Sequence, residues 1–228
     1  MASIRARQSD PHGVRAPAGT AVVAISGPME YRPGLLALLF GYGTSTLELT
    51  ATVRRLAADP ECKQIIMEID SPGGSIEGVS EAAAAIRAAR KVKPVYAVAA
   101  PMAASAAYWL AAQATRLLVM GSGQVGSIGV YGVHEDISKA AERIGVKTTL
   151  ISAGKYKTEG NPFEPLSDPA RADMQSKVDA HYRQFTDDVA FGRGVSPSAV
   201  PLPGNVDPYF LPLSFSIWSK MGRKMSVS

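Results

Sequence analysis

Short runs of apolar residues alternate in this chain with longer segments of helical pattern, and this alternation constrains the fold more than any other feature. Each run is a few residues long, and most are rich in valine, isoleucine or leucine. The runs interpreted as buried strands are Thr20–Ser26, Gln64–Ile69, Val95–Val98, Arg116–Met120 and Lys147–Ser152. Strands that alternate with helices pair in parallel and form one sheet. The sequence therefore predicts an α/β protein of repeated β-α units with a parallel sheet.

Helical segments separate these strands. In the first of them Ser45 is a capping residue and Glu48 follows it at the position typical of a capping box. The predicted helices are Ser45–Ala58, Glu77–Ala89, a short segment after Ser105, His134–Ile144 and Asp168–Arg193. The pattern predicts one domain over residues 20–198. We expect residues 1–19 to form a disordered arm and residues 199–228 an atypical tail.

Composition narrows the class of protein. The chain has 228 residues, 46% of them hydrophobic and 19% charged, which is ordinary for a soluble globular protein. Its formal net charge of +4 is spread along the sequence, so we expect no nucleic-acid partner. Residues 1–19 contain no apolar run that suits a signal peptide. Val95–Ala112 is uncharged, but Pro101 and Ser105 interrupt it, so we expect no membrane span and a cytoplasmic protein.

Ser105 is the polar residue that most suggests chemistry. It stands among alanines, between the strand that begins at Val95 and a helical segment. A serine at such a turn exposes its hydroxyl beside the free N–H groups of the helix start, where a substrate can bind. Two interpretations are open: Ser105 is an ordinary N-cap of the helix, or it is a nucleophile.

A nucleophilic serine needs a group that removes its proton. Histidine is the usual partner, but His12 lies in the N-terminal arm, and His134 and His181 lie at predicted helix positions. The other candidate is a lysine kept neutral by burial. Lys157 follows the predicted strand Lys147–Ser152 and can reach a site at the strand ends, although spacing alone fits a surface lysine equally well.

Two glycines follow the strand Gln64–Ile69. Gly73 and Gly74 allow a positive φ and let backbone N–H groups face a ligand, as in an oxyanion hole; a plain turn is the simpler interpretation. Cys62 is the single cysteine, which excludes an intrachain disulfide, and no neighbour in the sequence would activate it as a nucleophile.

Four motifs occur in order along the chain. They are Asp70-Ser71-Pro72-Gly73-Gly74, Ala104-Ser105-Ala106-Ala107-Tyr108, Gly126-Ser127-Ile128-Gly129-Val130 and Gly154-Lys155-Tyr156-Lys157. Together they resemble the signal peptide peptidase A (protease IV) family of serine peptidases, over residues 21–196. The sequence after Ser105 and in residues 160–166 is most similar to the phage branch of the family, the head-maturation or minor-capsid proteases.

The resemblance implies a ClpP/crotonase-like fold and a serine endopeptidase with a Ser-Lys dyad. Ser105 matches the nucleophile of the family and Lys157 matches its general base. Ser127 matches the serine that orients the lysine amine. These residues form the catalytic set that we expect.

Further positions follow from the same resemblance. The oxyanion hole matches Ala106 and either Gly73 or Gly74, and Gly126 and Gly129 are expected to contact the substrate. The resemblance implies no cofactor and no metal. It implies protein or peptide substrates such as capsid or scaffold proteins, and a homo-oligomer whose subunits complete each other's sites. For a phage enzyme, the resemblance implies a location in the host cytoplasm or in the virion or prohead.

Two other functions stay open at this point. The same fold can serve as a catalytically idle capsid-assembly scaffold, which the unmatched tail at residues 199–228 favours. An acyl-CoA enzyme of crotonase type shares the glycine-built oxyanion hole, but that class needs no Ser-Lys pair. The retention of Ser105, Ser127 and Lys157 favours the peptidase.

Overall fold

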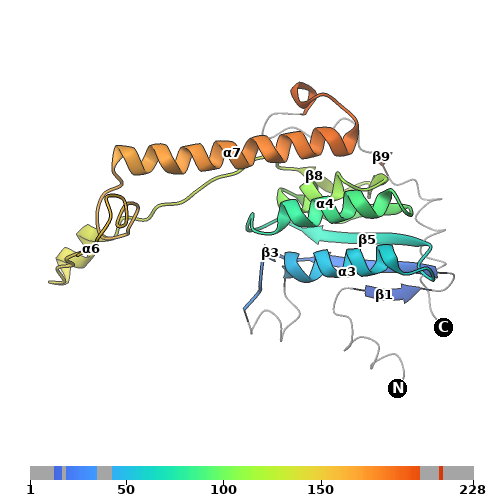
Figure 1. Cartoon of the computed structure of the whole chain (residues 1–228), viewed down its shortest axis with the longest axis horizontal. Helices are drawn as coiled ribbons and strands as arrows, with labels where there is room; N and C mark the ends of the chain where they lie inside the picture. Colours follow the sequence, from blue (N-terminus) through green and yellow to red (C-terminus); the bar gives the residue numbers. More distant parts are fainter. Residues whose placement is uncertain (1–12, 17–18, 35–42, 201–210, 213–228) are drawn as a thin grey trace, which may run out of the picture. The chain divides into compact units, whose positions relative to one another are not determined.

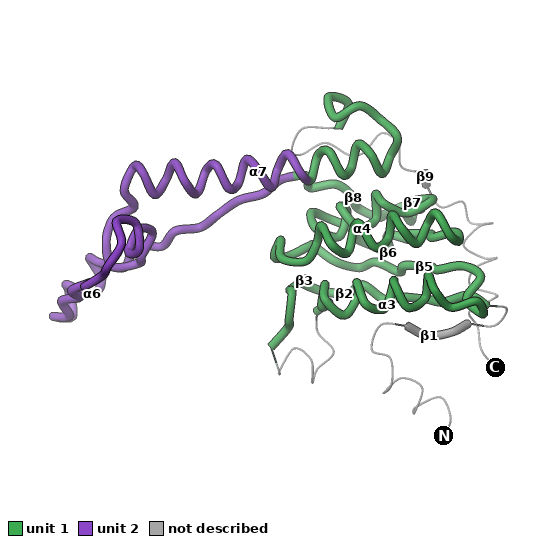
Figure 2. The backbone as a smooth tube through the Cα atoms, viewed as in Figure 1, with its two compact units in different colours: residues 1–128, 185–228 green, residues 129–184 purple. Residues whose placement is uncertain are grey.

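The computed structural model describes residues 13–16, 19–34, 43–200 and 211–212 of the chain. These fall into two compact units, shown in different colours in Figure 2. Unit 1 contains residues 1–128 and 185–228, and unit 2 contains residues 129–184. Most of the expected N-terminal arm and C-terminal tail lies outside the described residues.

A parallel sheet forms the centre of unit 1. Its strands are β1 (Gly13–Ala16), β2 (Thr20–Ser26), β5 (Gln64–Ser71), β6 (Val95–Ala104), β7 (Arg116–Val119), β8 (Gln124–Gly126) and β9 (Leu211–Pro212), in the order β1-β2-β5-β6-β7-β9 with β8 paired to the end of β6. The pairs β2–β5, β5–β6 and β6–β7 are all parallel, whereas β1 is antiparallel to β2. The predicted α/β architecture with a parallel sheet is confirmed.

Helices α3 (Thr46–Ala58) and α4 (Val79–Arg90) pack side by side on the sheet (Figure 1). Ser45 caps α3 as predicted, because its hydroxyl accepts the Glu48 N–H at 3.2 Å. Before α3, the short strands β3 (Met29–Glu30) and β4 (Thr44–Ser45) form a second, two-stranded sheet. The core consists of alternating strand residues under these helices, including Val23, Ile25, Ile65, Met67 and Ile69.

The remaining helices are α5 (Ala106–Ala111), α6 (Ser138–Arg143), α7 (Asp168–Arg193) and the 3₁₀ turn η2 (Pro197–Ala199). α6 belongs to unit 2. α7 has the bounds predicted from its spacing of apolar residues, and the chain passes from unit 2 into unit 1 within it, after Gln184. Its unit 1 portion buries Phe185, Val189 and Ala190.

Unit 2 differs from the sequence prediction in two places. Residues 147–152 form no strand, and the helix expected over His134–Ile144 is shortened to α6. The apolar side chains in the first segment are exposed, Ile151 at 94%. A strand needs a partner for its backbone N–H and C=O groups, and within the described residues this segment pairs with none.

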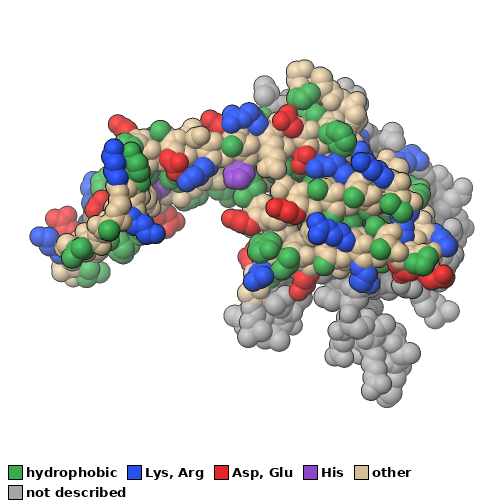
Figure 3. Space-filling model, in the orientation of Figure 1, with side chains coloured by type: hydrophobic (Ala, Val, Ile, Leu, Met, Phe, Trp, Pro, Cys, Tyr) green, Lys and Arg blue, Asp and Glu red, His purple; other side chains and the backbone are tan. Residues whose placement is uncertain are grey.

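Basic and acidic side chains are interspersed over the face of the molecule seen in Figure 3, in line with the dispersed charge of the sequence. Among the helices of the described residues, none is both long and apolar enough to cross a membrane.

Candidate active site

Ser105 occupies the turn between β6 and α5. Its φ of 51° is unusual for a residue other than glycine and marks local backbone strain. The Ser105 backbone N–H donates to the Gly126 carbonyl oxygen at 2.8 Å, whereas its side chain makes no cap hydrogen bond to α5. Ser105 is therefore not an ordinary capping serine. Its half-buried hydroxyl is available at the carboxyl end of the sheet.

Ser127 lies beside Ser105 because β8 pairs in parallel with the end of β6. The register places Ala104 opposite Gly126. Ser105 and Ser127 are the next residues after the two strands, so they lie side by side. Ser127 also has a positive φ, 55°, and it is exposed. The structure thus brings these two predicted residues together from segments that are separate in the sequence. Gly126 itself is buried.

Gly73 packs against the backbone of the Ser105 turn. It has a φ of 91°, and a Cβ atom added to it would lie 2.8 Å from the Ala104 oxygen, the Ala106 nitrogen and the Ser105 Cβ alike. A side chain at position 73 is therefore excluded both by conformation and by space. The positive φ that the sequence allowed at these glycines is present at Gly73.

Gly74 forms a parallel bridge with Met29. The Met29 N–H donates to the Gly73 oxygen at 2.9 Å, and the Ser75 N–H donates to the Met29 oxygen at 2.8 Å. In such a bridge the N–H and C=O of the middle residue face the opposite side. Gly27, two residues before Met29, bonds to the Asp70 oxygen on the β2 side of β5, so the Gly74 N–H faces the other side, where β6 pairs with β5.

Ala106 is the first residue of α5. The N–H groups of a first helical turn have no partner within their own helix. The Ala106 N–H therefore belongs to the same turn as the Ser105 hydroxyl. The Ala106 side chain is buried. Gly129, predicted to contact substrate, is half-buried and is the first residue of unit 2.

Lys157 lies in unit 2, in a run of turns over residues 155–160. It is exposed, and its backbone N–H donates to the Gly154 oxygen at 3.3 Å. The neighbouring Lys155 places its ammonium 5.0 Å from the centre of the Tyr156 ring, which is a cation–π distance. The burial expected of a neutral lysine is absent at Lys157 in the single chain.

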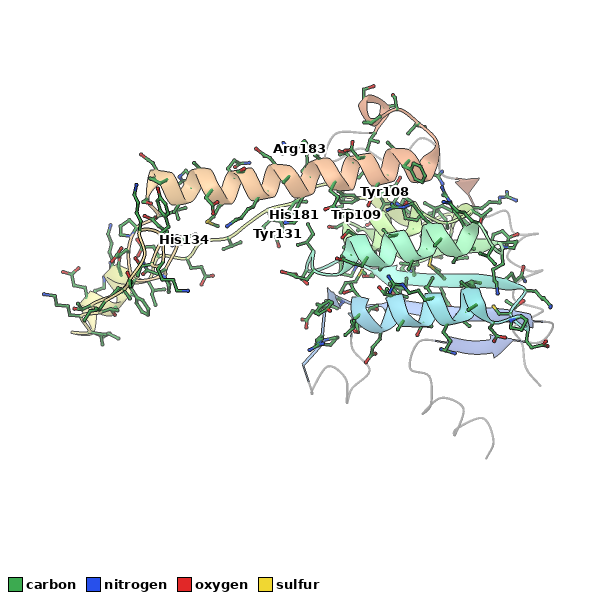
Figure 4. The ribbon with its side chains drawn as sticks, in the orientation of Figure 1. Tyr108, Trp109, Tyr131, His134, His181 and Arg183 are labelled. Carbon is green, nitrogen blue, oxygen red and sulfur yellow. The ribbon has the colours of Figure 1, made fainter. Side chains whose placement is uncertain are left out.

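Side-chain hydrogen bonds of Asn161 stabilise the turn that contains Lys157. The Asn161 amide donates to the Thr158 oxygen at 2.7 Å and accepts the Phe163 N–H at 2.8 Å. His134 Nε2 lies 2.9 Å from the backbone carbonyl oxygen of Asn161, so this histidine forms a hydrogen bond within unit 2. His134 and His181, both labelled in Figure 4, belong to unit 2, and His12 lies outside the described residues.

Cys62 and possible metal ligands are the other groups with reactive side chains in the described part of the chain. Cys62 is buried, with its sulfur 3.5 Å from the Gln64 carbonyl oxygen. Within residues 13–16, 19–34, 43–200 and 211–212, no three His, Cys, Asp or Glu side chains gather in a way that could hold a metal ion.

The contacts that hold α5 in place were not predicted from the sequence. Trp109, labelled in Figure 4, stacks on Phe185 with ring centres 4.6 Å apart and nearly parallel planes. Its indole N–H donates to the Asp188 carboxylate. In the same region, Arg90 donates to the backbone oxygens of Gln113 and Gly192, both at 3.0 Å. Burial, and secondarily the charge of Arg87, lower the pKa of Arg90. The sequence feature that could have indicated this packing is the pair of aromatic residues, Trp109 in α5 and Phe185 in α7.

Known proteins similar to this chain include two phage proteins. Over 182 residues, 80% of the chain, it is 36% identical both to the capsid assembly protease C of Escherichia phage lambda and to the head-tail preconnector protein GP5 of Enterobacteria phage P21. These matches cover 41% and 36% of the relatives, so the chain spans less than half of their length. Protease 4 of Salmonella typhi is 30% identical over 149 residues, which is 65% of this chain and 24% of that protein.

Two solved structures are similar at low sequence identity. A membrane-bound stomatin-specific protease, 1510-N, superposes with a TM-score of 0.47 and 14% identity, over 81% of this chain and 68% of that one. ClpP1 from Listeria monocytogenes superposes with a TM-score of 0.46 and 12% identity, over 88% of this chain and 81% of that one.

The family itself is shown by the sequence match. Residues 87–203, half of the chain, match Peptidase family S49, and this segment includes Ser105, Ser127 and Lys157. The relatives named above include proteases from a phage and from a bacterium. The resemblance inferred from the four motifs is confirmed, and this chain belongs to peptidase family S49.

Proposed function

We propose that this chain is a serine endopeptidase in which Ser105 attacks the substrate carbonyl and Lys157 is the general base. The observation that carries the proposal is the conformation of Ser105. A non-glycine residue held at φ 51° typically costs about 1–3 kcal/mol, and such strain is concentrated at functional sites. A serine that only capped α5 would adopt ordinary extended angles and use its hydroxyl for the cap, and Ser105 does neither.

The chemistry follows from these groups. Neutral Lys157 accepts the Ser105 proton as Oγ bonds to the peptide carbonyl carbon, and the carbonyl oxygen becomes an oxyanion. Protonated Lys157 then donates that proton to the leaving amine, and the acyl group stays on Ser105. A water molecule hydrolyses this ester, with Lys157 again as the base. Ser127, one position beyond the Ala104–Gly126 pair, orients the lysine amine in this scheme.

Two backbone N–H groups stabilise the oxyanion in this scheme. We assign them to Gly74 and Ala106. Gly73 is the weaker candidate, because its N–H already donates to the Ser71 hydroxyl at 3.1 Å, whereas the Gly74 N–H faces the Ser105 side of its strand. Loss of one such donor typically lowers kcat by about 10²–10³-fold. Gly126 and Gly129 border Ser127 and give the substrate backbone room to approach.

Lys157 becomes an effective base only when burial favours its neutral form. It is exposed in the single chain, and so are many apolar side chains of the same unit, among them Tyr131 at 85% and Ile144 at 77%. Exposed apolar surface of this extent is typical of an interface. We infer that the enzyme is a homo-oligomer in which unit 2 is covered by another subunit and Lys157 is thereby desolvated.

The natural substrates are proteins, and we propose capsid or scaffold proteins of a phage, met in the host cytoplasm or the prohead. The names of the two phage relatives support this choice. A catalytically idle assembly protein is the second candidate, because Lys157 is exposed in the single chain and one relative is named a head-tail preconnector protein.

A covalent probe separates the two candidates. Purified protein is treated with a fluorophosphonate and examined by intact-mass analysis, and casein hydrolysis is measured in parallel. We expect one label at Ser105 and measurable hydrolysis. Ser105→Ala should abolish both, and Lys157→Ala should lower both by about 10²–10⁴-fold, the usual contribution of a general base.

Lys155→Ala is the matched control, because Lys155 lies two positions away and contacts Tyr156. It should retain labelling and hydrolysis. Light scattering on the same samples reports the oligomer. A stable oligomer that is neither labelled nor active would favour the assembly protein, and loss of activity in Lys155→Ala with retention in Lys157→Ala would reassign the base.

A further inference from the structure

We propose that Ser71 is a positioning residue for the oxyanion hole: its hydroxyl fixes the Gly73–Gly74 turn so that the Gly74 N–H is the one that meets the substrate oxyanion. The proposal rests on the peptidase function proposed above and adds a side chain to it. Ser71 does not touch the substrate in this scheme. It acts through the backbone that it holds.

The Ser71 side chain is fully buried and uses its hydroxyl in two directions. Oγ donates to the Gly27 carbonyl oxygen at 2.7 Å and accepts the Gly73 N–H at 3.1 Å. The Gly27 N–H in turn donates to the Asp70 oxygen at 2.9 Å. The hydroxyl thus extends the β2–β5 ladder by one rung beyond its last backbone pair, Ser26–Asp70. The hydroxyl thereby ties the start of the turn to the end of β2, in addition to the backbone hydrogen bonds that Met29 makes with Gly73 and Ser75.

The position of Ser71 in the sheet links its hydroxyl contacts with Gly27 and Gly73 to the placement of Ser105. The β5–β6 register shifts between Ile69 and Ser71, because Ile69 pairs with Ala99 and Ser71 pairs with Ala103. Pairing therefore resumes at Ser71, immediately before the Ser105 turn. Irregularities of this kind commonly re-aim a strand next to an active site. Ser71 is the residue at which β5 regains its contact with β6.

The tight packing of Gly73 transmits any movement of the turn to the Ser105 turn. There is no room for even one added carbon between Gly73 and the backbone around Ser105. If the Ser71 hydroxyl is removed, the buried Gly73 N–H loses its acceptor and the peptide between Pro72 and Gly73 is free to rotate toward another one. That rotation changes the backbone angles of Gly73 and so tilts the next peptide, in which the Met29 N–H holds the Gly73 oxygen but no side chain of the described residues holds the Gly74 N–H. The Gly74 N–H then leaves its position, and the oxyanion loses a donor.

The test compares Ser71→Ala with Ser71→Thr, which retains a hydroxyl at the same position. On a peptide substrate, we expect Ser71→Ala to lower kcat by roughly 10–100-fold with little change in KM, since small misplacements of a catalytic group have effects of this size. The second-order rate of fluorophosphonate labelling should fall in proportion, because its phosphoryl oxygen occupies the same hole. Ser71→Thr should recover most of both rates.

Thr50→Ala is the control for the loss of a buried hydroxyl. Thr50 is buried in α3 and donates to the Thr46 oxygen at 2.7 Å, remote from the turn in sequence. It should lower the melting temperature and leave kcat per folded molecule unchanged. If Ser71→Ala does not fold, Ser71→Cys fills the same space with a weaker acceptor and should show the same selective loss of kcat.

The outcomes are distinct. A labelled wild type combined with unchanged kcat in folded Ser71→Ala or Ser71→Cys would overturn the role of Ser71 alone. Equal changes of kcat in Ser71→Ala and Thr50→Ala would also overturn that role, because a buried hydroxyl of any kind would then have the same effect. A wild type that is neither labelled nor active would overturn the peptidase function, and the role of Ser71 with it.

Discussion

The indole N–H of Trp109 donates a hydrogen bond of 2.8 Å to the Asp188 carboxylate, and this contact joins the helix that follows Ser105 to α7. The second carboxylate oxygen accepts Arg87 of α4 at 2.7 Å. Gln113, just beyond α5, donates to the Asp188 backbone oxygen at 3.1 Å. Asp188 is therefore the residue at which α4, α5 and α7 meet.

Asp188→Ala should lower the free energy of unfolding of unit 1 by roughly 2–3 kcal/mol, because Trp109 and Arg87 both lose a charged acceptor. The carboxylate is partly exposed, which keeps the loss below that of a deeply buried pair. Urea denaturation followed by tryptophan fluorescence measures it. Asp187→Ala, at the exposed neighbouring position, should change stability by less than about 0.5 kcal/mol. Equal losses of unfolding free energy in the two variants would show that the Asp188 contacts do not stabilise the packing of α4, α5 and α7.

Gly73→Ala should reduce both stability and activity. The positive φ costs about 1–3 kcal/mol for a residue with a side chain, and the new Cβ displaces the Ala106 nitrogen from its place. We expect fluorophosphonate labelling per folded molecule to fall by more than about tenfold, in line with the loss of an oxyanion donor. Gly121→Ala is the control, because nothing lies within 4 Å of its added Cβ. Normal labelling in Gly73→Ala would contradict the packing described here.

Lys93→Met should destabilise the end of α3. The Lys93 ammonium donates to three carbonyl oxygens, those of Leu56, Asp59 and Cys62, each at 2.8 Å. Methionine keeps much of the side-chain volume and removes all three donations, so we expect a loss of roughly 1–3 kcal/mol in the free energy of unfolding. Thermal and urea melts of Lys91→Met, an exposed lysine nearby in sequence, provide the comparison. A Lys93→Met protein as stable as Lys91→Met would show that the three contacts contribute nothing.

Asp136 should titrate below its ordinary range. Hydrogen bonds from the Ser138 side chain and then from its backbone N–H lower the pKa of Asp136 from 3.8. The ionised form is therefore favoured in the folded state. Its stabilisation of the start of α6 is present above the unfolded pKa and is lost as the pH falls through the folded pKa.

Carbon-detected NMR titration of the Asp136 carboxyl measures this pKa. Ser138→Ala removes the larger of the two hydrogen-bond contributions and should raise the pKa toward 3.8. Ser152→Ala, at an exposed serine of the same unit, should leave it unchanged. An Asp136 pKa that is identical in wild type and Ser138→Ala would show that the serine hydroxyl is not a partner.

Elements with strong local signals could be predicted from the sequence. β2 and α7 have the bounds that were predicted, and α3 begins at its predicted cap, Ser45. Their patterns are continuous in the sequence: apolar alternation or helical spacing, with a cap or a Gly-Pro break at the end. The position of Ser105 between a strand and a helix was predicted for the same reason.

Elements that depend on a distant partner could not be predicted. The segment 147–152 has a strand-like composition, yet it finds no partner in the described chain, whereas β8 forms inside a glycine-rich loop because the end of β6 offers it a ladder. β1, within the arm expected to be disordered, pairs with β2 in the same way. Pairing decides these cases, and composition does not.

By itself, the sequence determined the alternation of strands and helices, the order of the four motifs and hence the S49 family. Only the tertiary structure decided which groups meet at the site. Ser71 and Gly27 are 44 residues apart and Trp109 and Asp188 are 79 apart, so no local pattern indicates either contact. The Ser71 hydroxyl combines both kinds of contact: it accepts the Gly73 N–H only two residues away, but its donation to the distant Gly27 oxygen depends on the folded sheet, because a buried polar group must find a partner.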